Sequence, residues 1–514
     1  MKSLLCILFL IIFLTEGVAQ NKFNRLYRFD SSLYNSVQFH TMKIVNNAIY
    51  TAGIGVVIDS TYLTNPGIFT KFDLQGNLIY NKYQGRFPVS NEFRGDLFVV
   101  LPNNDFSLTG SNWDSSFSVV MVNKSGDQIF TKQHFPSPRN FRYSAPRSIT
   151  QLSDNHFVLA VNETRLGNTK SSIFFVDSLG NKRSSYNLES TWEFMNPLQM
   201  SLSKSKKLNV MTRAMTGDFQ NVNFQYVTQL YELDTLGNVL WRYQTPTNRY
   251  IYGDGFVQLA NSNYLMWGYE EYSRPDAVNR FRLLDSVRPF LREIKPNVGV
   301  VWEKNFSMLI QPTIFDLKIL KDSSIVFVGR YIDTTNVLLK QGYLIKLNKN
   351  RDSVYKRTLV HPTFSHGMAF YFPEKIEELD NGDLVIAGYA QDNKVGSPTR
   401  YTWGWLIRTD SLGCSLEPTC RVPTQEVEKG PLSIKAFPNP AKDVLTIEYT
   451  PENNDKDLDI TVSDVMGKVV IRQSLDVFRD PLSINVSNLS VGLYFCTFTV
   501  KSKGSATQKV VIVR

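Results

Sequence analysis

Two stretches of this 514-residue chain decide its fold: Ile319 to Gly329 (ILKDSSIVFVG) and Glu378 to Gly388 (ELDNGDLVIAG). Each consists of two apolar segments joined by a polar turn, which is the pattern of two short strands in a tight hairpin. The pattern occurs five more times, at residues 44–53, 100–110, 151–161, 202–212 and 258–268. Repetition of one unit along a chain indicates a repeat architecture rather than a set of unrelated domains.

A second hairpin follows each of these units, as in Leu230 to Tyr243 (LYELDTLGNVLWRY). Asp, Asn and Gly occupy its turn because a tight hairpin needs residues that tolerate positive φ. In chain order the turn residues are Gly76, Gly126, Gly180, Gly237, Gly299, Asn350 and Gly413. Four strands in each of seven repeats predict an all-β fold, a seven-bladed β-propeller. The aromatic content of 13% agrees, because aromatic residues favour strands.

The seventh repeat lacks a fourth strand: it runs from Trp405 to Leu412 and turns at Gly413. Phe23 to Phe29 (FNRLYRF), which precedes the first repeat, resembles the fourth strand of that repeat at Asn77 to Tyr83 (NLIYNKY). We therefore expect this N-terminal strand to complete the last blade, because ring closure removes exposed strand edges. Six blades with an additional loose hairpin are the alternative.

The first 19 residues predict a secretory signal peptide. Lys2 supplies a positive charge, Leu4 to Leu14 is an apolar run too short for a stable membrane span, and small residues permit cleavage after Ala19. An N-terminal membrane anchor is the alternative. We expect an exported mature chain without a transmembrane segment. Its propeller would occupy residues 20–421, followed by a linker at 422–430 and a C-terminal domain at 431–514.

The C-terminal domain has short alternating segments that predict a small, Ig-like antiparallel β-sandwich. Four segments are distinctive: AFPNPAKDVL at 436–445, VMGKVV at 465–470, LSVGLYF at 489–495 and the final KVVIVR. In this order they resemble the type A C-terminal sorting domain of the type IX secretion system of Bacteroidota. The residues that carry the resemblance are Pro438, Asn439, Pro440, Gly467, Gly492 and Tyr494.

The resemblance implies passage through the periplasm, recognition by the type IX secretion machinery and translocation across the outer membrane. It also implies removal of the sorting domain, followed by secretion or attachment to lipopolysaccharide at the cell surface. Cys496 stands where an aliphatic residue is usual. An ordinary carbohydrate-binding sandwich is the alternative for this domain.

Binding is expected on one face of the propeller, where the longer and more variable loops emerge together. Aromatic residues and arginines are the residue types favoured as interface anchors. On these loops the candidates are Trp113, Arg139, Arg142, Tyr143, Trp192, Tyr250, Tyr269, Tyr272, Tyr401 and Trp403. The alternative is that many of them cover the core or pack loops together.

Motifs for catalysis, metals and cofactors are absent from the sequence. It has neither a glycine-rich phosphate loop nor a GxSxG nucleophile elbow. His361 and His366 lie five residues apart in a loop, a spacing that does not place two metal ligands on one helix face. We therefore assign no metal, cofactor or catalytic residue. Cys414 and Cys420 are expected to form a disulfide in an oxidising compartment.

These observations favour an exported, monomeric, non-enzymatic module that binds a glycan or a protein. Most of the net charge of +9 lies in the propeller and would favour acidic glycans or lipopolysaccharide. Nucleic acid is excluded as a partner by export. The alternatives are a secreted propeller hydrolase acting on polysaccharide and a structural surface component. The hydrolase would require two or more carboxylates converging on the central funnel.

Overall fold

The computed structural model describes residues 22–29, 36–58, 63–64, 67–84, 96–111, 116–135, 143–153, 156–165, 168–188, 192, 194–216, 225–271, 287–306, 310–332, 340–364, 369–392, 401–415, 434–449, 458–464, 469–475, 482–500 and 504–514. Most of these residues lie in β-strands, and the helical element among them is the short turn η2 (Pro362–Phe364). None of the helices in this part of the chain is long and apolar enough to cross a membrane. The chain divides into two compact units, residues 1–419 and 420–514.

In the N-terminal unit, successive strands pair antiparallel in groups of four, and each group is named here after its first strand. The earlier groups are β2 (Ser36–Val45), β3 (Ala48–Ile58), β5 (Gly67–Asp73) and β6 (Leu78–Tyr83), with the two-residue β4 (Leu63–Thr64) beside β3; β7 (Phe98–Val100), β8 (Phe106–Ser111), β9 (Phe117–Val122) and β10 (Gln128–His134); and β11 (Tyr143–Ser153), β12 (His156–Arg165), β13 (Asn168–Asp177) and β14 (Lys182–Asn187).

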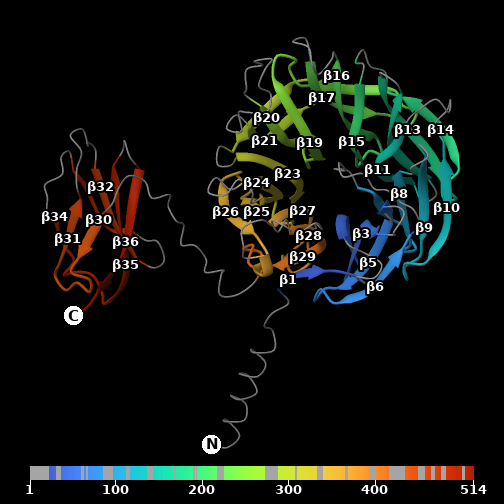
Figure 1. Cartoon of the computed structure of the whole chain (residues 1–514). Coiled ribbons are helices and arrows are strands. Elements are labelled where there is room, and N and C mark those ends of the chain that lie inside the picture. The colour runs from blue at the N-terminus through green and yellow to red at the C-terminus, as the bar shows by residue number, and fades with distance from the viewer. Residues whose placement is uncertain are drawn as a thin grey trace, which may run out of the picture. The chain divides into compact units, whose positions relative to one another are not determined.

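The later groups are β15 (Phe194–Leu202), β16 (Leu208–Thr216), β17 (Gln225–Leu233) and β18 (Val239–Gln244); β19 (Tyr250–Gln258), β20 (Tyr264–Glu271), β21 (Val287–Lys295) and β22 (Gly299–Asn305); β23 (Ile310–Ile319), β24 (Ile325–Ile332), β25 (Lys340–Leu347) and β26 (Ser353–Leu359); and β27 (Ala369–Glu378), β28 (Leu384–Asp392) and β29 (Tyr401–Thr409). Figure 1 shows the groups around a central axis, in a propeller-like arrangement, with first strands such as β15 and β19 innermost.

The β27 group receives its fourth strand from the start of the chain. Strand β1 (Phe23–Tyr27) pairs antiparallel with β29, in a register that runs from Phe23 opposite Arg408 to Tyr27 opposite Gly404. On the inner side, Ser36 of β2 bridges Thr402 of β29. The last group is therefore joined to the first by chain segments that are almost 400 residues apart in sequence.

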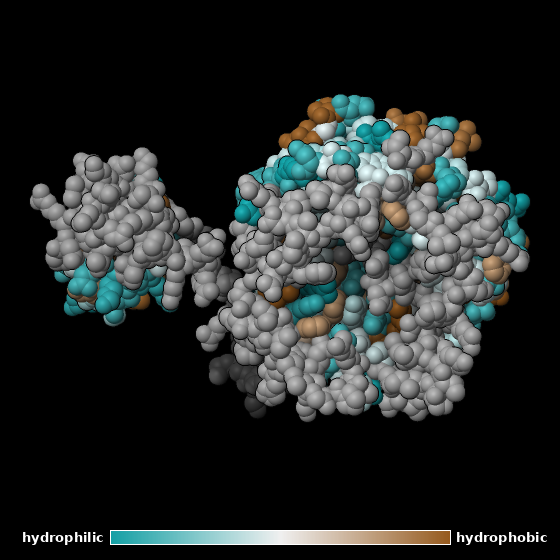
Figure 2. Space-filling view, turned by 45° about the horizontal axis from the view of Figure 1, so that its top comes forward, coloured by the Kyte–Doolittle hydropathy of each residue, from teal (hydrophilic) through white to brown (hydrophobic). Residues whose placement is uncertain are grey.

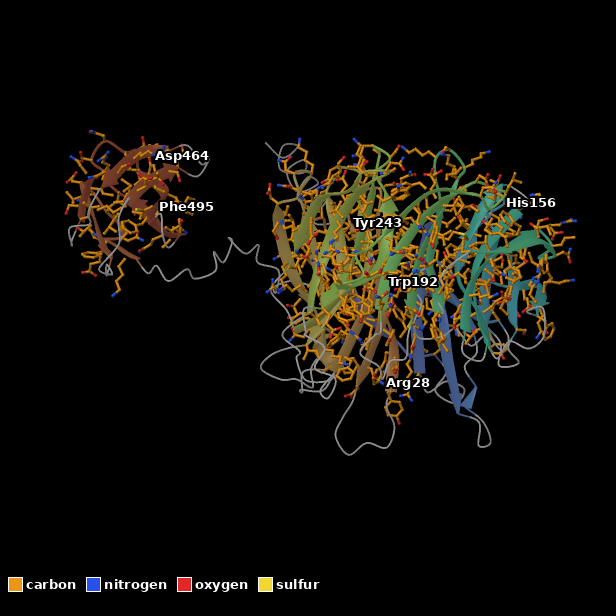
Figure 3. All side chains as sticks on the ribbon, turned by 90° about the horizontal axis from the view of Figure 1, so that it is seen from above. Arg28, His156, Trp192, Tyr243, Asp464 and Phe495 are labelled. Carbon is orange, nitrogen blue, oxygen red and sulfur yellow. The ribbon has the colours of Figure 1, made fainter. Side chains whose placement is uncertain are left out.

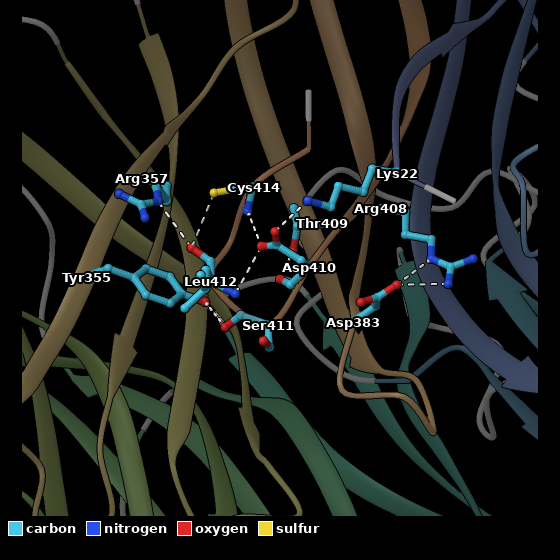
Figure 4. Close-up of polar contacts among 10 residues, drawn as sticks. All are labelled: Lys22, Tyr355, Arg357, Asp383, Arg408, Thr409, Asp410, Ser411, Leu412 and Cys414. Carbon is cyan, nitrogen blue, oxygen red and sulfur yellow. Dashed lines mark hydrogen bonds and ion pairs between the residues drawn. The ribbon is translucent and has the colours of Figure 1, made fainter. Parts of the chain in front are cut away.

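Side chains around β1 fasten this junction, which we call the closure seam. Lys22 Nζ lies 2.6 Å from a carboxylate oxygen of Asp410 (Figure 4). The indole N–H of Trp405 donates to Asn24 Oδ1 at 2.7 Å, and Asn24 Nδ2 donates to the carbonyl oxygen of Val360 at 2.8 Å. These bonds tie β1 to β29 and to the end of the β23 group.

Arg408 ties the seam to the β2 group from the other side. Its side chain is only 3% exposed, and its Nε and Nη2 both donate to Asp383 Oδ2, at 3.0 and 2.8 Å (Figure 4). Its Nη1 donates to the carbonyl oxygen of Leu74 at 2.7 Å. A buried guanidinium is stable only when its charge is paired and its N–H groups are bonded, and this one meets both conditions.

A repeated contact between an aromatic ring and a turn glycine joins neighbouring groups. Gly76 has a φ of 77°, and a Cβ added there would lie 2.8 Å from the ring of Phe23. A Cβ on Gly126, whose φ is 80°, would lie 2.5 Å from the ring of Tyr80. Glycine is thus required both by the left-handed backbone and by the ring that covers it. The contact recurs between Tyr186 and Gly237 and between Tyr355 and Gly413.

The glycine contact also crosses the closure seam, because Phe23 belongs to β1 and Gly76 to the turn after β5. One expected turn position differs. In the β23 group the left-handed residue is Arg351, with a φ of 70°, rather than Asn350. The guanidinium of Arg351 lies 4.2 Å from the ring centroid of Trp302, on the preceding outer strand, which is a cation–π contact.

Buried aromatic rings fill the spaces between groups. Phe69 of the β2 group packs 4.9 Å from Phe106 of the β7 group, measured between ring centroids. Phe117 of the β7 group lies 5.3 Å from Phe174 of the β11 group. All four rings are no more than 3% exposed. The aromatic content that is conspicuous in the composition is thus used largely for packing one sheet against the next.

The C-terminal unit consists of two antiparallel sheets that share one core. One sheet contains β30 (Ile434–Phe437), β31 (Val444–Tyr449) and β34 (Leu482–Asn485). The other contains β33 (Val469–Leu475), β32 (Leu458–Asp464), β35 (Gly492–Val500) and β36 (Gly504–Ile512). Leu445 and Ile447 from the first sheet pack with Ile460 and Phe498 from the second. Cys496 is a buried free thiol in this core.

The residues singled out near the start of this unit have a structural role. Asn439 Nδ2 donates to the carbonyl oxygen of Lys509 at 2.8 Å, and the N–H of Val511 donates to Asn439 Oδ1 at 2.9 Å. The amide of Asn439 therefore pairs with the edge of β36 as a backbone peptide would. Pro438 and Pro440 are exposed on either side of it.

Two of the remaining motif residues, Gly492 and Tyr494, lie in β35. Tyr494 is buried and its hydroxyl donates to the carbonyl oxygen of Ser490 at 3.0 Å. Gly492 begins β35. Gly467 lies outside the described residues.

Candidate functional site

β-Bulges recur in the innermost strands of six of the groups, and each bulge contributes one extra residue. For example, Pro197 and Gln199 of β15 pair with consecutive residues of β16, so Leu198 between them is the extra residue of the bulge. A bulge redirects the side chain of its extra residue, which is why bulges recur next to binding sites. The extra residues, in chain order, are His40, Arg147, Leu198, Asp254, Phe315 and Glu374.

The bulges are held by the preceding group in the ring. In several cases the backbone N–H two residues after the bulge donates to a side chain of that group. The pairs are Met200 with Ser148 Oγ at 3.1 Å, Phe256 with Gln199 Oε1 at 2.8 Å, and Ile376 with Asp316 Oδ2 at 3.0 Å. The positions of the redirected side chains are thus fixed by bonds between sheets and not by loops.

A second row of side chains comes from the strands next to the innermost ones. Each of these side chains belongs to the residue directly after the last position of the first hairpin in its repeat. In three of the groups that last position is a glycine, namely Gly268, Gly329 or Gly388. A Cβ on any of these glycines would lie 1.9 Å from a carbonyl oxygen of the innermost strand, so only glycine permits the approach. In four successive groups the residue after this position is alternately an arginine and a tyrosine: Arg213, Tyr269, Arg330 and Tyr389.

The two rows line a cavity of about 360 Å³ near one end of the central axis. Figure 2 shows a face of the N-terminal unit that is hollowed at its centre, with both hydrophilic and hydrophobic residues inside the hollow. The cavity is lined by the first residues of innermost strands and the last residues of second strands. The longer loops begin at this same level. Its described lining contains three arginines, six aromatic residues and the carboxylate of Glu374.

Two stacks of aromatic rings form walls of the cavity. In one, the ring centroid of Tyr252 lies 4.1 Å from that of Tyr226 and 4.7 Å from that of Tyr269, whose ring is nearly parallel to it at 11°. In the other, Phe372 lies 4.3 Å from Tyr389 at 13°. Phe315 adjoins Phe372 at 6.3 Å. Each stack is built from two neighbouring groups or strands and contributes aromatic surface to the lining.

An arginine accompanies each aromatic stack. The guanidinium of Arg330 lies 4.5 Å from the ring centroid of Phe372 and 5.6 Å from that of Phe315. Arg213 beside the tyrosine stack is held differently: its Nε donates to the carbonyl oxygen of Gly253 at 3.1 Å, and its Nη2 pairs with the fully buried Asp254. Both guanidinium groups are therefore oriented before any ligand binds.

Tyr226 lines the cavity, and its hydroxyl lacks a hydrogen-bond partner among the described residues. Its side chain is 5% exposed. Burial raises the pKa of Tyr226 well above its ordinary value, so the phenol keeps its proton and can act as a donor. A buried hydroxyl without a partner costs free energy that a bound acceptor would recover.

A network of charged side chains crosses the axis between the groups next to the seam. Lys43 lies 2.6 Å from Asp96, and Lys375 lies 3.4 Å from Asp96 and 3.7 Å from Asp316. Burial alone would raise the pKa of Asp96, but the two lysines hold it well below its ordinary value. The pKa of Asp316 is raised, because burial outweighs the single lysine beside it. The charges of this network balance one another, and it joins groups from both ends of the unit.

Of the ten residues predicted to bind ligand, Tyr269 lines the cavity. Trp192 packs against the core of the β11 and β15 groups (Figure 3), and Tyr250 is half-buried at the start of β19. Tyr401 lies under the guanidinium of Arg28 at 4.7 Å, and Trp403 packs 4.9 Å from Phe364. Tyr143 begins β11, and its side chain is outside the described part of the chain. Trp113, Arg139, Arg142 and Tyr272 lie outside the described residues.

The other residues considered from the sequence have structural surroundings. The carbonyl oxygen of Asn24 lies 3.2 Å from His361 Nε2, and His366 is outside the described residues. Among the described residues, no three His, Cys, Asp or Glu side chains gather as a metal site would require. Cys414 is buried beside Asp410, whose carboxylate accepts its N–H at 2.9 Å, and Cys420 lies outside the described residues.

Sequence reasoning missed most of the cavity because it searched the loops. Arg213, Arg330, Tyr226 and Phe372 all lie in strands. A signal was nevertheless present, since in the last four repeats the residue after the first hairpin is alternately an arginine and a tyrosine.

Residues 435–513 match the family of secretion system C-terminal sorting domains. The C-terminal unit is a type IX sorting domain. The resemblance stated from the sequence is thereby confirmed, and the sorting domain shows that the chain is exported, to the cell surface or into the medium. It also implies an interaction of this chain with the secretion machinery.

No curated protein matches the sequence of the chain. Solved structures to which this chain is similar include a protein of unknown function from Bacteroides caccae, with 12% identity and a TM-score of 0.35, covering 61% of this chain and 92% of that one. A mutant puromycin hydrolase in complex with PGG has 10% identity and a TM-score of 0.47, with 82% and 61% of the two chains covered. Polysaccharide lyase Uly1 has 9% identity and a TM-score of 0.45, and the match covers 77% of this chain and 95% of that one.

Proposed function

We propose that this protein is an exported, non-enzymatic binding module. Its N-terminal unit would be a seven-bladed β-propeller whose last blade β1 completes, and its sorting domain an Ig-like sandwich. A signal peptide of 19 residues and a disulfide between Cys414 and Cys420 belong to the same proposal. The propeller would bind a glycan or a protein at the cell surface or in the medium.

The observation that carries this proposal is the cavity formed by the two rows of strand residues. Its volume of about 360 Å³ lies within the range of small-molecule sites, and its lining combines aromatic surface with a few oriented polar groups. The side chains are fixed by bulges and sheet-to-sheet hydrogen bonds, so little conformational entropy would be lost on binding. A surface used only for structure has no need of such a preformed site.

A polysaccharide hydrolase is less well supported by the described residues. Glycoside hydrolysis ordinarily uses two carboxyl groups on either side of the bond that is cleaved. In the described lining Glu374 supplies one carboxylate, and the neighbouring Asp254 is buried against Arg213. A role as a purely structural surface component would leave the cavity without a ligand.

An array of glycans and peptides probed with the full chain tests the proposal. Met215→Trp should abolish any binding found, because Met215 is half-buried in the lining and a large side chain there would fill the cavity. Thr216→Trp is the matched control, since the next residue of β16 points to the opposite side of the strand. A silent array, or binding that Met215→Trp leaves intact, would overturn the proposal.

Release and surface attachment are distinguished by a separate experiment on the sorting domain. Cells expressing the chain without residues 431–514 should retain the protein in the periplasm. Fractionation of the intact chain then shows whether it remains with the cells or enters the medium.

A further inference from the structure

We propose that the cavity binds a carboxylate-bearing sugar residue of an acidic glycan, an inference that rests on the binding function proposed above. Three properties of the described lining lead to this ligand class: its flat aromatic walls, its excess of oriented positive charge, and a buried hydroxyl that has no acceptor.

The aromatic walls favour a ring-shaped ligand. The tyrosine stack around Tyr252 and the stack of Phe372 on Tyr389 both line the cavity, with centroid separations of 4.7 and 4.3 Å within them. The C–H-rich faces of a sugar ring pack well on such surfaces, and polar groups around the ring then fix its orientation. The cavity volume of about 360 Å³ is near the lower end of the range for ligand sites. It therefore matches a terminal residue or a short segment of a glycan better than the surface of a folded protein.

The charges of the lining favour an anion. Arg147, Arg213 and Arg330 face the cavity, whereas the carboxylates on this level are those of Glu374 and Asp254. Asp254 is fully buried and pairs with Arg213, so it offsets that arginine. In the rest of the described lining, Arg147 and Arg330 against Glu374 leave an excess of one positive charge, which one ligand carboxylate would neutralise.

Arg330 has the geometry expected of a carboxylate anchor. Its guanidinium is supported by the ring of Phe372 at 4.5 Å, which desolvates one face and keeps the group from rotating freely. An arginine can meet the two oxygens of a carboxylate with two parallel N–H donors, so Arg330 in the cavity lining is the candidate anchor. A lysine in the same place could not provide this planar match.

Tyr226 supplies the independent observation that a polar ligand group is expected here. It is 95% buried, it lines the cavity, and its hydroxyl has no hydrogen-bond partner among the described residues. Native structures rarely leave a buried hydroxyl unpaired. An oxygen of the bound sugar would provide the missing acceptor.

Titration calorimetry on the full chain tests this inference with three oligosaccharides of matched length: an oligogalacturonide, a neutral galactan oligomer and a sulfated galactan oligomer. The oligogalacturonide should bind, and the neutral oligomer should bind at least about tenfold more weakly because it lacks the charge-assisted bonds. Arg330→Gln should weaken binding of the acidic oligomer about tenfold or more, and Tyr226→Phe about three- to tenfold. Arg242→Gln and Tyr83→Phe, on exposed outer strands, are the matched controls and should have no effect.

The outcomes separate this inference from the function on which it rests. Equal binding of the neutral and acidic oligomers, blocked by Met215→Trp, would retain the binding function and overturn the acidic specificity. Tighter binding of the sulfated oligomer would overturn the assignment to a carboxylate. Acidic binding unchanged in both Arg330→Gln and Tyr226→Phe would place the ligand elsewhere and contradict the inference. A silent glycan and peptide array would remove the binding function itself.

Discussion

The closure seam and the cavity use the same kinds of residues for opposite purposes. At the seam, the guanidinium of Arg408 is 3% exposed and is fully engaged by Asp383 and by the carbonyl oxygen of Leu74. In the cavity, Arg330 rests on an aromatic ring and remains half-buried, and the hydroxyl of Tyr226 has no partner among the described residues. The guanidinium of Arg408 is completely bonded within the protein, whereas the hydroxyl of Tyr226 is left without a described partner on a rigid scaffold and is available to a ligand.

The largest expected effect comes from removing β1. Deletion of residues 22–29 takes away the partner of β29, the ring that covers Gly76 and the bonds of Asn24, so the chain should lose its cooperative unfolding transition and aggregate through the exposed edge. Circular dichroism during thermal unfolding measures this. A synthetic peptide of residues 22–29 added to the truncated chain should restore the transition. A truncated chain that unfolds like the intact one would show that the seam does not hold the ring.

The next effect separates the two arginines. Arg408→Ala removes a buried guanidinium, leaves the 16% exposed carboxylate of Asp383 without its partner, and should lower the free energy of unfolding by about 3 kcal/mol, the lower end of the range for a broken buried pair. Arg330→Ala should cost only about 1 kcal/mol, the worth of a partly exposed cation–π contact. Urea unfolding of both variants gives the values. Similar losses in the two variants would contradict the distinction between seam and cavity.

A smaller effect concerns pH and the bulge residue His40. Burial lowers the pKa of His40 to about 4, and its Nε2 makes no hydrogen bond to a described residue. Between pH 6.5 and 4 the unfolded chain therefore binds a proton that the folded chain does not, and stability falls as the pH falls through this interval. The loss attributable to His40 should reach about 3 kcal/mol near pH 4. It is measured as the difference in pH dependence between the native chain and His40→Asn, and identical pH profiles would contradict it.

The smallest effect on stability is expected for Tyr226→Phe. The hydroxyl has no partner to lose among the described residues, so the midpoint of thermal unfolding should stay the same or rise slightly. Differential scanning calorimetry measures this midpoint. Tyr264→Phe is the contrasting variant, because the hydroxyl of Tyr264 is bonded to Asn209 and Glu232 and its loss should destabilise the fold by about 1 kcal/mol. A clear destabilisation by Tyr226→Phe would mean that its hydroxyl already has a structural partner.

The repeat architecture could be predicted because hairpin turns and strand alternation are encoded locally. Turn residues such as Gly76 and Gly126 show the positive φ that the sequence pattern requires. The place of β1 beside β29 was also accessible, since an incomplete last repeat and a spare strand at the other end are both visible in the sequence. The sorting domain was recognisable from motifs within about 80 residues, and the family match confirms it.

The cavity could not be predicted in the same way because its geometry depends on contacts between sheets. No turn residue in the sequence marks a bulge such as that at Leu198. The N–H of Met200, two residues later, donates a hydrogen bond to Ser148 Oγ from another group. The search for aromatic residues in loops found Tyr269, which does line the cavity. It also selected Trp192, Tyr401 and Trp403, which in the structure pack against neighbouring side chains.

A crystal structure of the full chain with a bound acidic oligosaccharide tests the central claim most directly. The account predicts a sugar ring against the tyrosine stack of Tyr252, with its carboxylate on Arg330 and an oxygen within hydrogen-bonding distance of Tyr226 Oη. A sugar bound instead on the surface formed by Tyr401 and Trp403, with the cavity empty, would contradict it.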